Sequence, residues 1–321
     1  RTEGSKLSML DDWQIPDATA LGIGAWNSET VFHSIEIQGA DGKPMTLAAN
    51  STPGPARPLP VRPRSSTPRP TSPATTTPPV PTRPAGTQSG PQNRVLIVIA
   101  NQDFFYREYG EPREELERAG IEVEVAAGRV APCRPHGNSG QGADGGVVTP
   151  DLALADVDVS RYDAILFSGG WGSSMYQYAF EGSYNNRVYN GERSIKQVTN
   201  QLINEFVALD KYVCALCHGT SILAWSRVGG RSLLAGRQAT GPTRQGPSGV
   251  YNGRQSQPPS RWNLEANGAR VVASNAIGNR NTAADDIVAD GKILTGQDDI
   301  SAREMGRQIA ARVRPASRDS R

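Results

Sequence analysis

The sequence has few cysteines and no long hydrophobic run. Three cysteines in 321 residues exclude a small fold held together by disulfides. No segment approaches the ~20 consecutive apolar residues of a membrane span, so the sequence excludes an integral membrane protein. Hydrophobic residues still make up 37% of the chain, enough for a core, and its length predicts roughly two folded units at about 150 residues each.

Acidic residues are absent from residues 51–93, a segment that holds five arginines and 13 prolines. Because proline fixes φ and removes backbone donors, this segment is predicted to be an extended, disordered linker. Its five arginines exceed the net charge of +2, so the rest of the chain is mildly acidic. This distribution argues against a nucleic-acid partner, which needs basic charge clustered on a folded face.

Residues 1–50 are too few to bury a core of their own. Leu21–Trp26 and Thr30–Ile37 read as two short strands, and their pattern resembles the end of a concanavalin-type jelly roll. We predict the last strands of a truncated β-sandwich here. The chain begins with Arg1 and shows no secretion signal, which leaves the compartment open. The Thr/Pro-rich linker is typical of extracytoplasmic bacterial modules.

Residues 94–315 alternate apolar runs with amphipathic segments, and residues 316–321 are predicted to be a disordered tail. This order predicts a three-layer α/β/α sandwich with a mainly parallel sheet. The last helix is expected to begin at Ser301, with Glu304 completing a capping box. The predicted strands cover 95–99, 121–125, 164–167, 212–216, 271–273, 287–289 and 292–294. The first predicted helix carries Glu108, Pro112 and Leu116 and is closed by Ala119-Gly120. The other predicted helices cover about 195–207, 219–228 and 301–313.

The strand at 212–216 ends in Ala215-Leu216-Cys217-His218-Gly219, the small-x-nucleophile-x-Gly pattern of a nucleophile elbow. A cysteine at a helix N-terminus is expected to have a lowered pKa, which favours Cys217 as a nucleophile over a core cysteine. Cys214 is expected to be a core residue, because a second Cys pair for a zinc site is missing. Cys133 and His136 are expected in an exposed loop without metal.

Several runs together resemble the PfpI superfamily, which includes intracellular proteases, a deglycase and glyoxalase III chaperones on a class I glutamine amidotransferase-like, flavodoxin-like fold. These runs are VLIVIANQDFFYREYGEPREELERAGIEVEVAAG, YDAILFSGGWG, YVCALCHGTSILA, LLAGRQATG and ADGKILTGQDDISARE. The resemblance implies a nucleophile at Cys217, a catalytic histidine at His218 and, at Glu108, an acid that hydrogen-bonds the thiol. It also implies oxyanion donors at the amides of Gly170 and His218, with Gly169, Trp171 and Gly219 beside the pocket.

The sequence departs from the family pattern in two places. Relatives with a Cys-His-acid triad often take the acid from the segment after the "TG" strand, but residues 241–263 contain no Asp or Glu. Glu265 or an acid from a partner subunit remains as a candidate to orient His218. The Tyr- and Asn-rich stretch 171–190 is expected to shape the mouth of the pocket.

The resemblance implies an enzyme that uses Cys217 on small carbonyl compounds or their adducts, as a glyoxalase or deglycase does. Two alternatives stay open: a peptidase or amidase that uses the same thiol, and a non-catalytic module that binds a ligand or senses oxidants. No cofactor or metal is expected, and a small carbonyl compound or a peptide would be the substrate. The family also implies a homo-oligomer and a cytoplasmic location.

Overall fold

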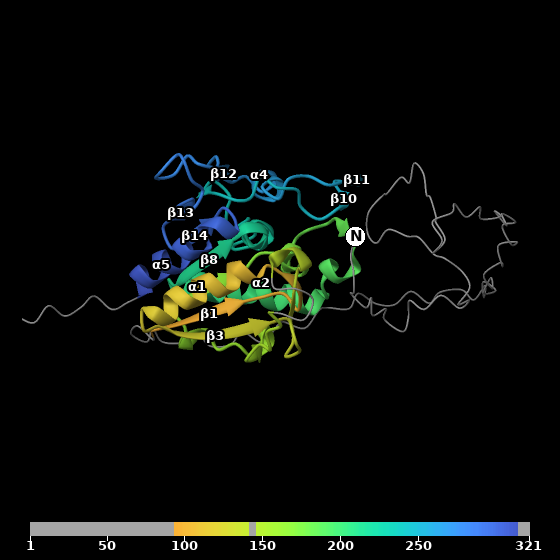
Figure 1. Cartoon of the computed structure of the whole chain (residues 1–321). Coiled ribbons are helices and arrows are strands. Elements are labelled where there is room, and N and C mark those ends of the chain that lie inside the picture. Colours follow the sequence, from red (N-terminus) through yellow and green to blue (C-terminus); the bar gives the residue numbers. More distant parts are fainter. Residues whose placement is uncertain (1–92, 141–145, 314–321) are drawn as a thin grey trace, which may run out of the picture. The chain divides into compact units, whose positions relative to one another are not determined.

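The computed structural model describes residues 93–140 and 146–313. The predicted β-sandwich strands, nearly all of the predicted linker and the C-terminal tail lie outside the described residues. Within them, the chain folds as strands and helices around one sheet (Figure 1).

The central sheet is mainly parallel. From one edge to the other its strands are β13 (Ile287–Asp290), β14 (Ile293–Gly296), β8 (Tyr212–Leu216), β6 (Ala164–Phe167), β1 (Arg94–Val98), β3 (Glu122–Ala127) and β5 (Leu152–Ala153). Only β13 runs antiparallel, paired with β14. The chain adds β3 and β5 on one side of β1 and then crosses to add β6, β8 and β14 on the other. The order reverses between β1 and β6, which is where such sheets form ligand crevices.

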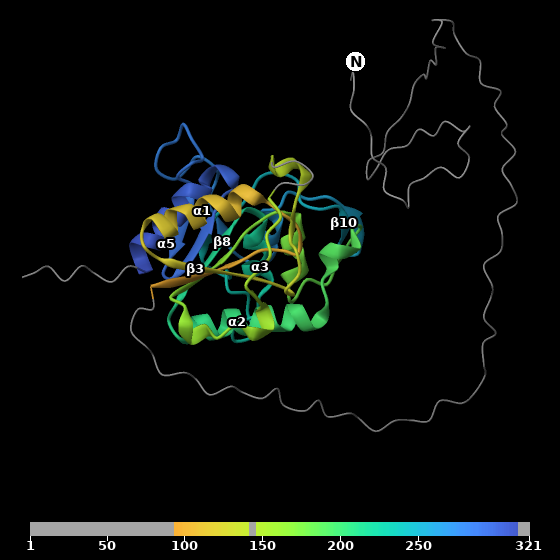
Figure 2. The ribbon, with the colours of Figure 1, turned by 60° about the horizontal axis from the view of Figure 1, so that its bottom comes forward.

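Helices cover both faces of the sheet, which gives the predicted three layers. α1 (Tyr106–Arg118) and α5 (Ala302–Val313) lie on one face and α2 (Arg193–Ala208) on the other (Figure 2). Of the apolar residues predicted on one face of α2, Ile195, Leu202, Ile203 and Phe206 are buried. Val198 and Val207 are partly buried and pack against the core. The shorter helices are α3 (Thr220–Trp225) and α4 (Trp262–Ala266), and the 3₁₀ turns are η2 (Gly137–Ser139), η3 (Leu154–Asp156), η4 (Val159–Arg161), η5 (Trp171–Tyr176), η6 (Arg187–Asn190), η7 (Cys217–Gly219) and η8 (Asp299–Ser301).

Three details of the predicted elements are wrong: the residues of a capping box, the end of a helix and the sheet to which a strand belongs. The capping box before α5 joins Asp298 to Ser301, because Asp298 accepts the Ile300 amide while the Ser301 hydroxyl accepts the Asp298 amide. The helix expected over 219–228 ends at Trp225. The run at 271–273 does not enter the central sheet; β12 (Arg270–Val271) instead pairs with β9 (Gln238–Ala239) in a separate two-stranded sheet.

Two further small sheets stand beside the central one. β2 (Gln102–Phe104) pairs with β4 (Arg134–Pro135), and β11 (Arg254–Ser256) pairs with β10 (Gly249–Tyr251), which pairs with β7 (Ser183–Tyr184). The Tyr- and Asn-rich stretch 171–190 supplies β7, and most of its aromatic side chains are buried. They form a second hydrophobic cluster with Tyr251, built around Phe180, Tyr184 and Tyr189.

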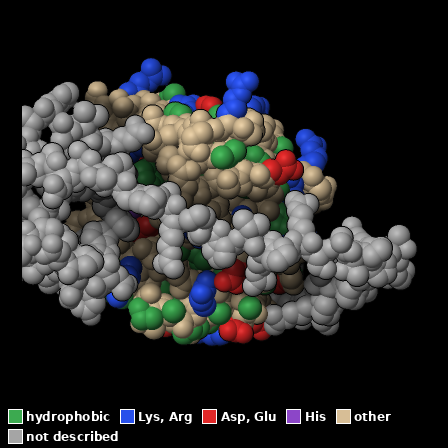
Figure 3. Space-filling model, turned by 90° about the vertical axis from the view of Figure 1, so that its right-hand side faces the viewer, with side chains coloured by type: hydrophobic (Ala, Val, Ile, Leu, Met, Phe, Trp, Pro, Cys, Tyr) green, Lys and Arg blue, Asp and Glu red, His purple; other side chains and the backbone are tan. Residues whose placement is uncertain are grey.

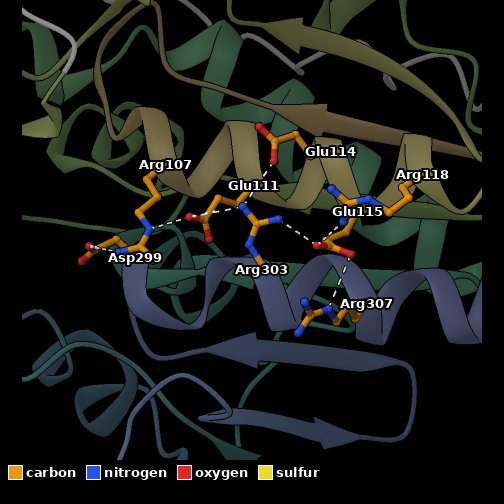
Figure 4. A network of polar contacts seen from close by, with 8 residues as sticks. All are labelled: Arg107, Glu111, Glu114, Glu115, Arg118, Asp299, Arg303 and Arg307. Atoms are coloured by element: carbon orange, nitrogen blue, oxygen red, sulfur yellow. Dashed lines mark hydrogen bonds and ion pairs between the residues drawn. The ribbon is translucent and has the colours of Figure 1, made fainter.

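Ion pairs line the contact between α1 and α5 (Figure 4). The two helices approach closely at Gly306, where a Cβ would lie 2.7 Å from the Pro112 Cα atom. Arg303 forms ion pairs with Glu111, Glu114 and Glu115. Glu115 also forms ion pairs with Arg118 and Arg307. We call Glu111, Glu114, Glu115, Arg118, Arg303 and Arg307 the α1–α5 network.

Basic and acidic side chains are interspersed on the uncovered part of the face in Figure 3, with no continuous basic patch there. The expectation that nucleic acid is not a partner stays a prediction for the whole surface. Across 93–140 and 146–313, no helix has the length and apolar character needed to span a bilayer.

Candidate functional site

The turn after β8 holds Cys217 in a conformation that non-glycine residues rarely adopt. Its φ is +53°, and the chain turns sharply there from strand into η7 and α3. Gly219 fits the turn because a Cβ at this position would lie 2.6 Å from the Phe167 carbonyl oxygen. The elbow predicted from the sequence is therefore present, and the Cys217 side chain is only partly covered.

Glu108 reaches the sulfur of Cys217 from the first turn of α1. The two side chains are hydrogen-bonded, and the backbone N–H of His218 also donates to the sulfur. Glu108 is 1% exposed, and its Oε2 atom has no hydrogen-bond partner among the described residues. No ion pair with an arginine or lysine is formed by this carboxyl within that part of the chain.

Burial raises the pKa of Glu108 well above its ordinary value of 4.5, although the hydrogen bond with Cys217 acts in the opposite direction. Burial, followed by the charge of Glu108, also raises the pKa of Cys217. The expectation that the helix terminus lowers the thiol pKa is wrong in this respect, because desolvation outweighs the dipole. Since the two acids interact, the pair carries at most one negative charge near neutral pH.

Two glycines after β6 make room for this pair. A Cβ on Gly169 would collide with Glu108 Oε2 and would lie 2.7 Å from the Leu216 carbonyl oxygen and 2.8 Å from the Cys217 Cβ atom. Gly170 has a φ of +89°, and a Cβ there would meet the backbone at Phe105, 2.6 Å from its nitrogen. The Gly170 N–H has no acceptor among the described residues. It is thus free to donate to an oxyanion.

His218 follows the nucleophile, but both of its ring nitrogens contact serine hydroxyls. Its Nε2 atom lies 2.8 Å from Ser174 Oγ, and its Nδ1 atom lies 2.8 Å from Ser260 Oγ. Burial lowers the pKa of His218 to about 4. The ring is therefore neutral near pH 7, and it joins η5 to the segment before α4.

Comparisons with known proteins concern the family and the fold of the chain. The sequence model of the DJ-1/PfpI family matches residues 93–182. An uncharacterized Staphylococcus aureus protein is 30% identical over 143 residues, which are 44% of this chain and 71% of that protein. The chain belongs to the DJ-1/PfpI family.

Two other proteins show how far the similarity extends. An uncharacterized protein of Methanocaldococcus jannaschii is 31% identical over 147 residues, which are 46% of this chain. The match spans 58% of that protein's own length. The X-ray structure of Francisella tularensis Rapid Encystment Protein 24 kDa covers 69% of this chain and 99% of its own, with a TM-score of 0.52 at 18% identity. This structural likeness shows the flavodoxin-like fold.

Three of the site residues that the DJ-1/PfpI resemblance predicts lie next to one another: Cys217, Glu108 and Gly169. Glu265 does not orient His218, because its carboxylate pairs with Arg261 one helical turn away at 2.9 Å. Trp171 lies beside the site and packs edge to face on His136, with ring centroids 5.7 Å apart.

The remaining cysteines lie outside this site. Cys214 is fully buried in β8, as predicted for a core residue. The exposed loop expected at Cys133 is wrong for that residue, which is fully buried and pairs by backbone with Val148. His136 caps η2 by accepting the Asn138 amide. Within the described ranges, no group of three or more His, Cys, Asp or Glu side chains is arranged to hold a metal ion.

Sequence reasoning missed five side chains around this DJ-1/PfpI elbow. Ser174 and Ser260 hold His218, and Arg244 pairs with Asp299 at 3.1 Å and with Asp298 at 3.6 Å. The charge of Asp298 raises the pKa values of both Cys217 and Glu108. The acids could have been found, because they directly follow β14 at the sheet edge that carries the elbow. The serines lie in loops without any such signal.

Proposed function

We propose that this DJ-1/PfpI protein is a cysteine-dependent enzyme that acts on small carbonyl compounds or their adducts. The observation that carries the proposal is the contact of the buried Glu108 with the partly covered Cys217, hydrogen-bonded to each other at a glycine-lined elbow. A thiol that adds to an aldehyde needs a neighbouring group to move protons. Glu108 is the titratable side chain in contact with the sulfur.

The proposed reaction on a 2-oxoaldehyde has three steps. The Cys217 sulfur adds to the aldehyde carbon, the carbonyl oxygen gains a proton, and a hemithioacetal forms. Glu108 then takes the proton from that carbon while the adjacent carbonyl oxygen gains a proton, which gives an enediol. Glu108 returns its proton to the adjacent carbon as the first hydroxyl loses its own, which yields the thioester of a 2-hydroxy acid. Water cleaves the thioester, releasing the 2-hydroxy acid and restoring the thiol.

The raised pKa of Glu108 fits its proposed role, in which the carboxyl group first holds a proton and later accepts one. Before the addition, the pair carries at most one negative charge, because burial and mutual repulsion raise both pKa values. Once the sulfur is bonded to carbon it no longer competes for charge, so Glu108 ionises more readily and acts as a base. The Gly170 N–H, free of other acceptors, would stabilise the oxyanion that develops.

Amide hydrolysis has less support from the site. In Cys-His-acid enzymes the histidine contacts the nucleophile and is oriented by a carboxylate. Here the two ring nitrogens of His218 are engaged by Ser174 and Ser260, and the ring is neutral. We therefore assign proton transfer to Glu108. For His218 we propose a structural role, in which its ring holds Ser174 and Ser260 in place.

The test is methylglyoxal consumption by the full chain, with lactate followed as the product. We expect turnover by the wild-type protein and none by Cys217→Ala. Cys214→Ala is the matched control, because it removes a buried thiol from the same strand and should keep its activity. Circular dichroism of each variant checks that it is folded.

Three results would contradict the proposal. Equal turnover by Cys217→Ala would remove the thiol from the reaction. Absence of turnover together with thiol-dependent cleavage of a peptide substrate would favour the peptidase alternative. Absence of both, with Cys217 oxidised by peroxide, would favour a redox-sensing module.

A further inference from the structure

A surface cavity of about 500 Å³ lies between the segment after η5 and the first turn of α2. In the described part of the chain, none of its lining side chains hydrogen-bonds Cys217, Glu108 or His218. The residues that line the cavity include two cations, Arg193 and Lys196, and the aromatic side chain of Tyr178. It is therefore a separate candidate binding site.

Lys196 is a half-buried cation without a partner. Burial alone lowers its pKa, and no described carboxylate or carbonyl oxygen pairs with its ammonium group. Lys211 shows the usual arrangement, because its half-buried ammonium donates to backbone carbonyls, including Val159 at 2.8 Å and Tyr162. A desolvated charge without such partners is costly. A bound anion would supply what the described protein does not.

Arg193 adds a second positive charge to the lining of the cavity. It is exposed and forms no ion pair with a described residue. Cations at the N-terminal end of a helix are disfavoured by the helix dipole. The first turn of α2 contains no acidic residue that would offset these two positive charges. The preceding carboxylate of Glu192 turns to Arg129 at 3.0 Å. Two positive charges thus face the cavity, enough to balance a dianion.

The lining also offers an exposed aromatic ring and a carboxylate. Tyr178 is 41% exposed, which is unusual among the large hydrophobic side chains of the described chain. Glu181 also lines the cavity, but its charge acts on Arg227 and does not neutralise Lys196. A flat ring can stack on Tyr178, and hydroxyl groups can donate to Glu181.

We propose that this cavity binds a nucleoside monophosphate, with its phosphate on Arg193 and Lys196, its base against Tyr178 and its ribose hydroxyls near Glu181. Phosphate is favoured over a carboxylate because two cations converge on the site, and a phosphate monoester carries a charge close to −2. The cavity volume falls within the range of small-ligand sites.

Calorimetric titration of the full chain with AMP, adenosine and inorganic phosphate tests the proposal. AMP should bind at least about tenfold more tightly than either of the other probes, since only AMP contacts both the two cations and the aromatic ring. Lys196→Gln and Arg193→Gln should each weaken AMP binding about tenfold, because each removes a charge-assisted contact. Arg261→Gln is the control, because it removes a positive charge from α4 and should leave AMP binding unchanged.

Tyr178→Ser should weaken AMP binding but leave phosphate binding unchanged. Equal affinities for AMP and adenosine would overturn the role of the anion. AMP binding that survives both Lys196→Gln and Arg193→Gln would overturn the site, as would a wild-type protein that binds none of the probes. Thermal midpoints of all variants separate loss of binding from loss of fold, and Lys196→Arg should restore most of the affinity.

Discussion

Helix α1 carries two well-covered glutamates whose environments are opposite. Glu108 is 1% exposed, has no cation beside it, and has a pKa raised by burial. Glu115 is 8% exposed, but it forms ion pairs with arginine side chains at the surface, chiefly Arg118. These arginines lower the pKa of Glu115. Low exposure alone therefore does not determine the charge of a carboxyl group. The partners that cover it determine the charge.

The elbow site around Glu108 and the α1–α5 network around Glu115 also differ in what their carboxyl groups do. The α1–α5 network neutralises its acids and fastens two helices together (Figure 4). The elbow site keeps one carboxyl next to a thiol, in surroundings that hold its proton. A residue whose pKa is perturbed by burial and by one specific partner in a cleft is a functional candidate, whereas a residue in an ion network is a structural one. Changes made in parallel at Glu108 and Glu115 test this distinction.

The largest expected effect is on turnover in Glu108→Gln. The amide keeps the shape of the side chain but cannot accept and release a proton, so methylglyoxal turnover should fall by roughly 10²- to 10⁴-fold. Alkylation of Cys217 by iodoacetamide should persist. Glu115→Gln is the matched control on the same helix and should keep wild-type turnover. Equal losses in both variants would show that the helix as a whole supports the activity.

Gly169→Ala should damage the elbow region through sterics. The added Cβ would collide with Glu108 Oε2 and press on the Leu216 carbonyl, so we expect a loss of about 1–3 kcal/mol in the free energy of unfolding and strongly reduced turnover. Gly137→Ala is the control, since a Cβ there meets nothing within 4 Å. Urea denaturation of both variants measures the difference. A Gly169→Ala protein as stable as wild type would contradict the close approach.

The sequence was sufficient to predict the layers, the parallel sheet and the elbow. Each depends on local signals: short apolar runs, amphipathic periods, and a small-x-Cys-x-Gly turn such as the one at Cys217. The contrast between Glu108 and Glu115 could not be predicted, because both read as acids on one helix. Their difference arises from α5 and from the strand ends, which come from distant parts of the chain. The hydrogen bonds of His218 to serines were unpredictable for the same reason.

The pH dependence of stability should shift in opposite directions in the two glutamine variants. Glu108 has a raised folded-state pKa, so wild-type stability falls as the pH rises from 4.5 towards that pKa, and Glu108→Gln removes this fall. Glu115 has a lowered pKa, so its contribution is present above 4.5 and is lost as the pH falls through the folded value. Glu115→Gln should flatten that acid limb.

Urea denaturation from pH 3 to 8 measures both limbs. His218, whose pKa is lowered to about 4, also weakens the fold as the pH falls below the ordinary histidine value of 6.5. Its contribution is common to wild type and both variants, so it cancels in the differences. A Glu108→Gln difference that does not change with pH would mean that the Glu108 carboxyl is not held protonated in the folded protein.

The smallest expected effect is that of Arg303→Met. This change keeps much of the aliphatic stem and removes the ion pairs with Glu114 and Glu115, so we expect a loss of about 0.5–1 kcal/mol that shrinks at high salt. Arg261→Met, which breaks a single pair on α4, should cost less. Turnover should stay at the wild-type level, because the elbow carboxyl receives no charge compensation from Arg303. A drop in turnover with unchanged stability would show that the α1–α5 network acts on the elbow through Arg107 and Asp299, and would join two regions that the geometry keeps apart.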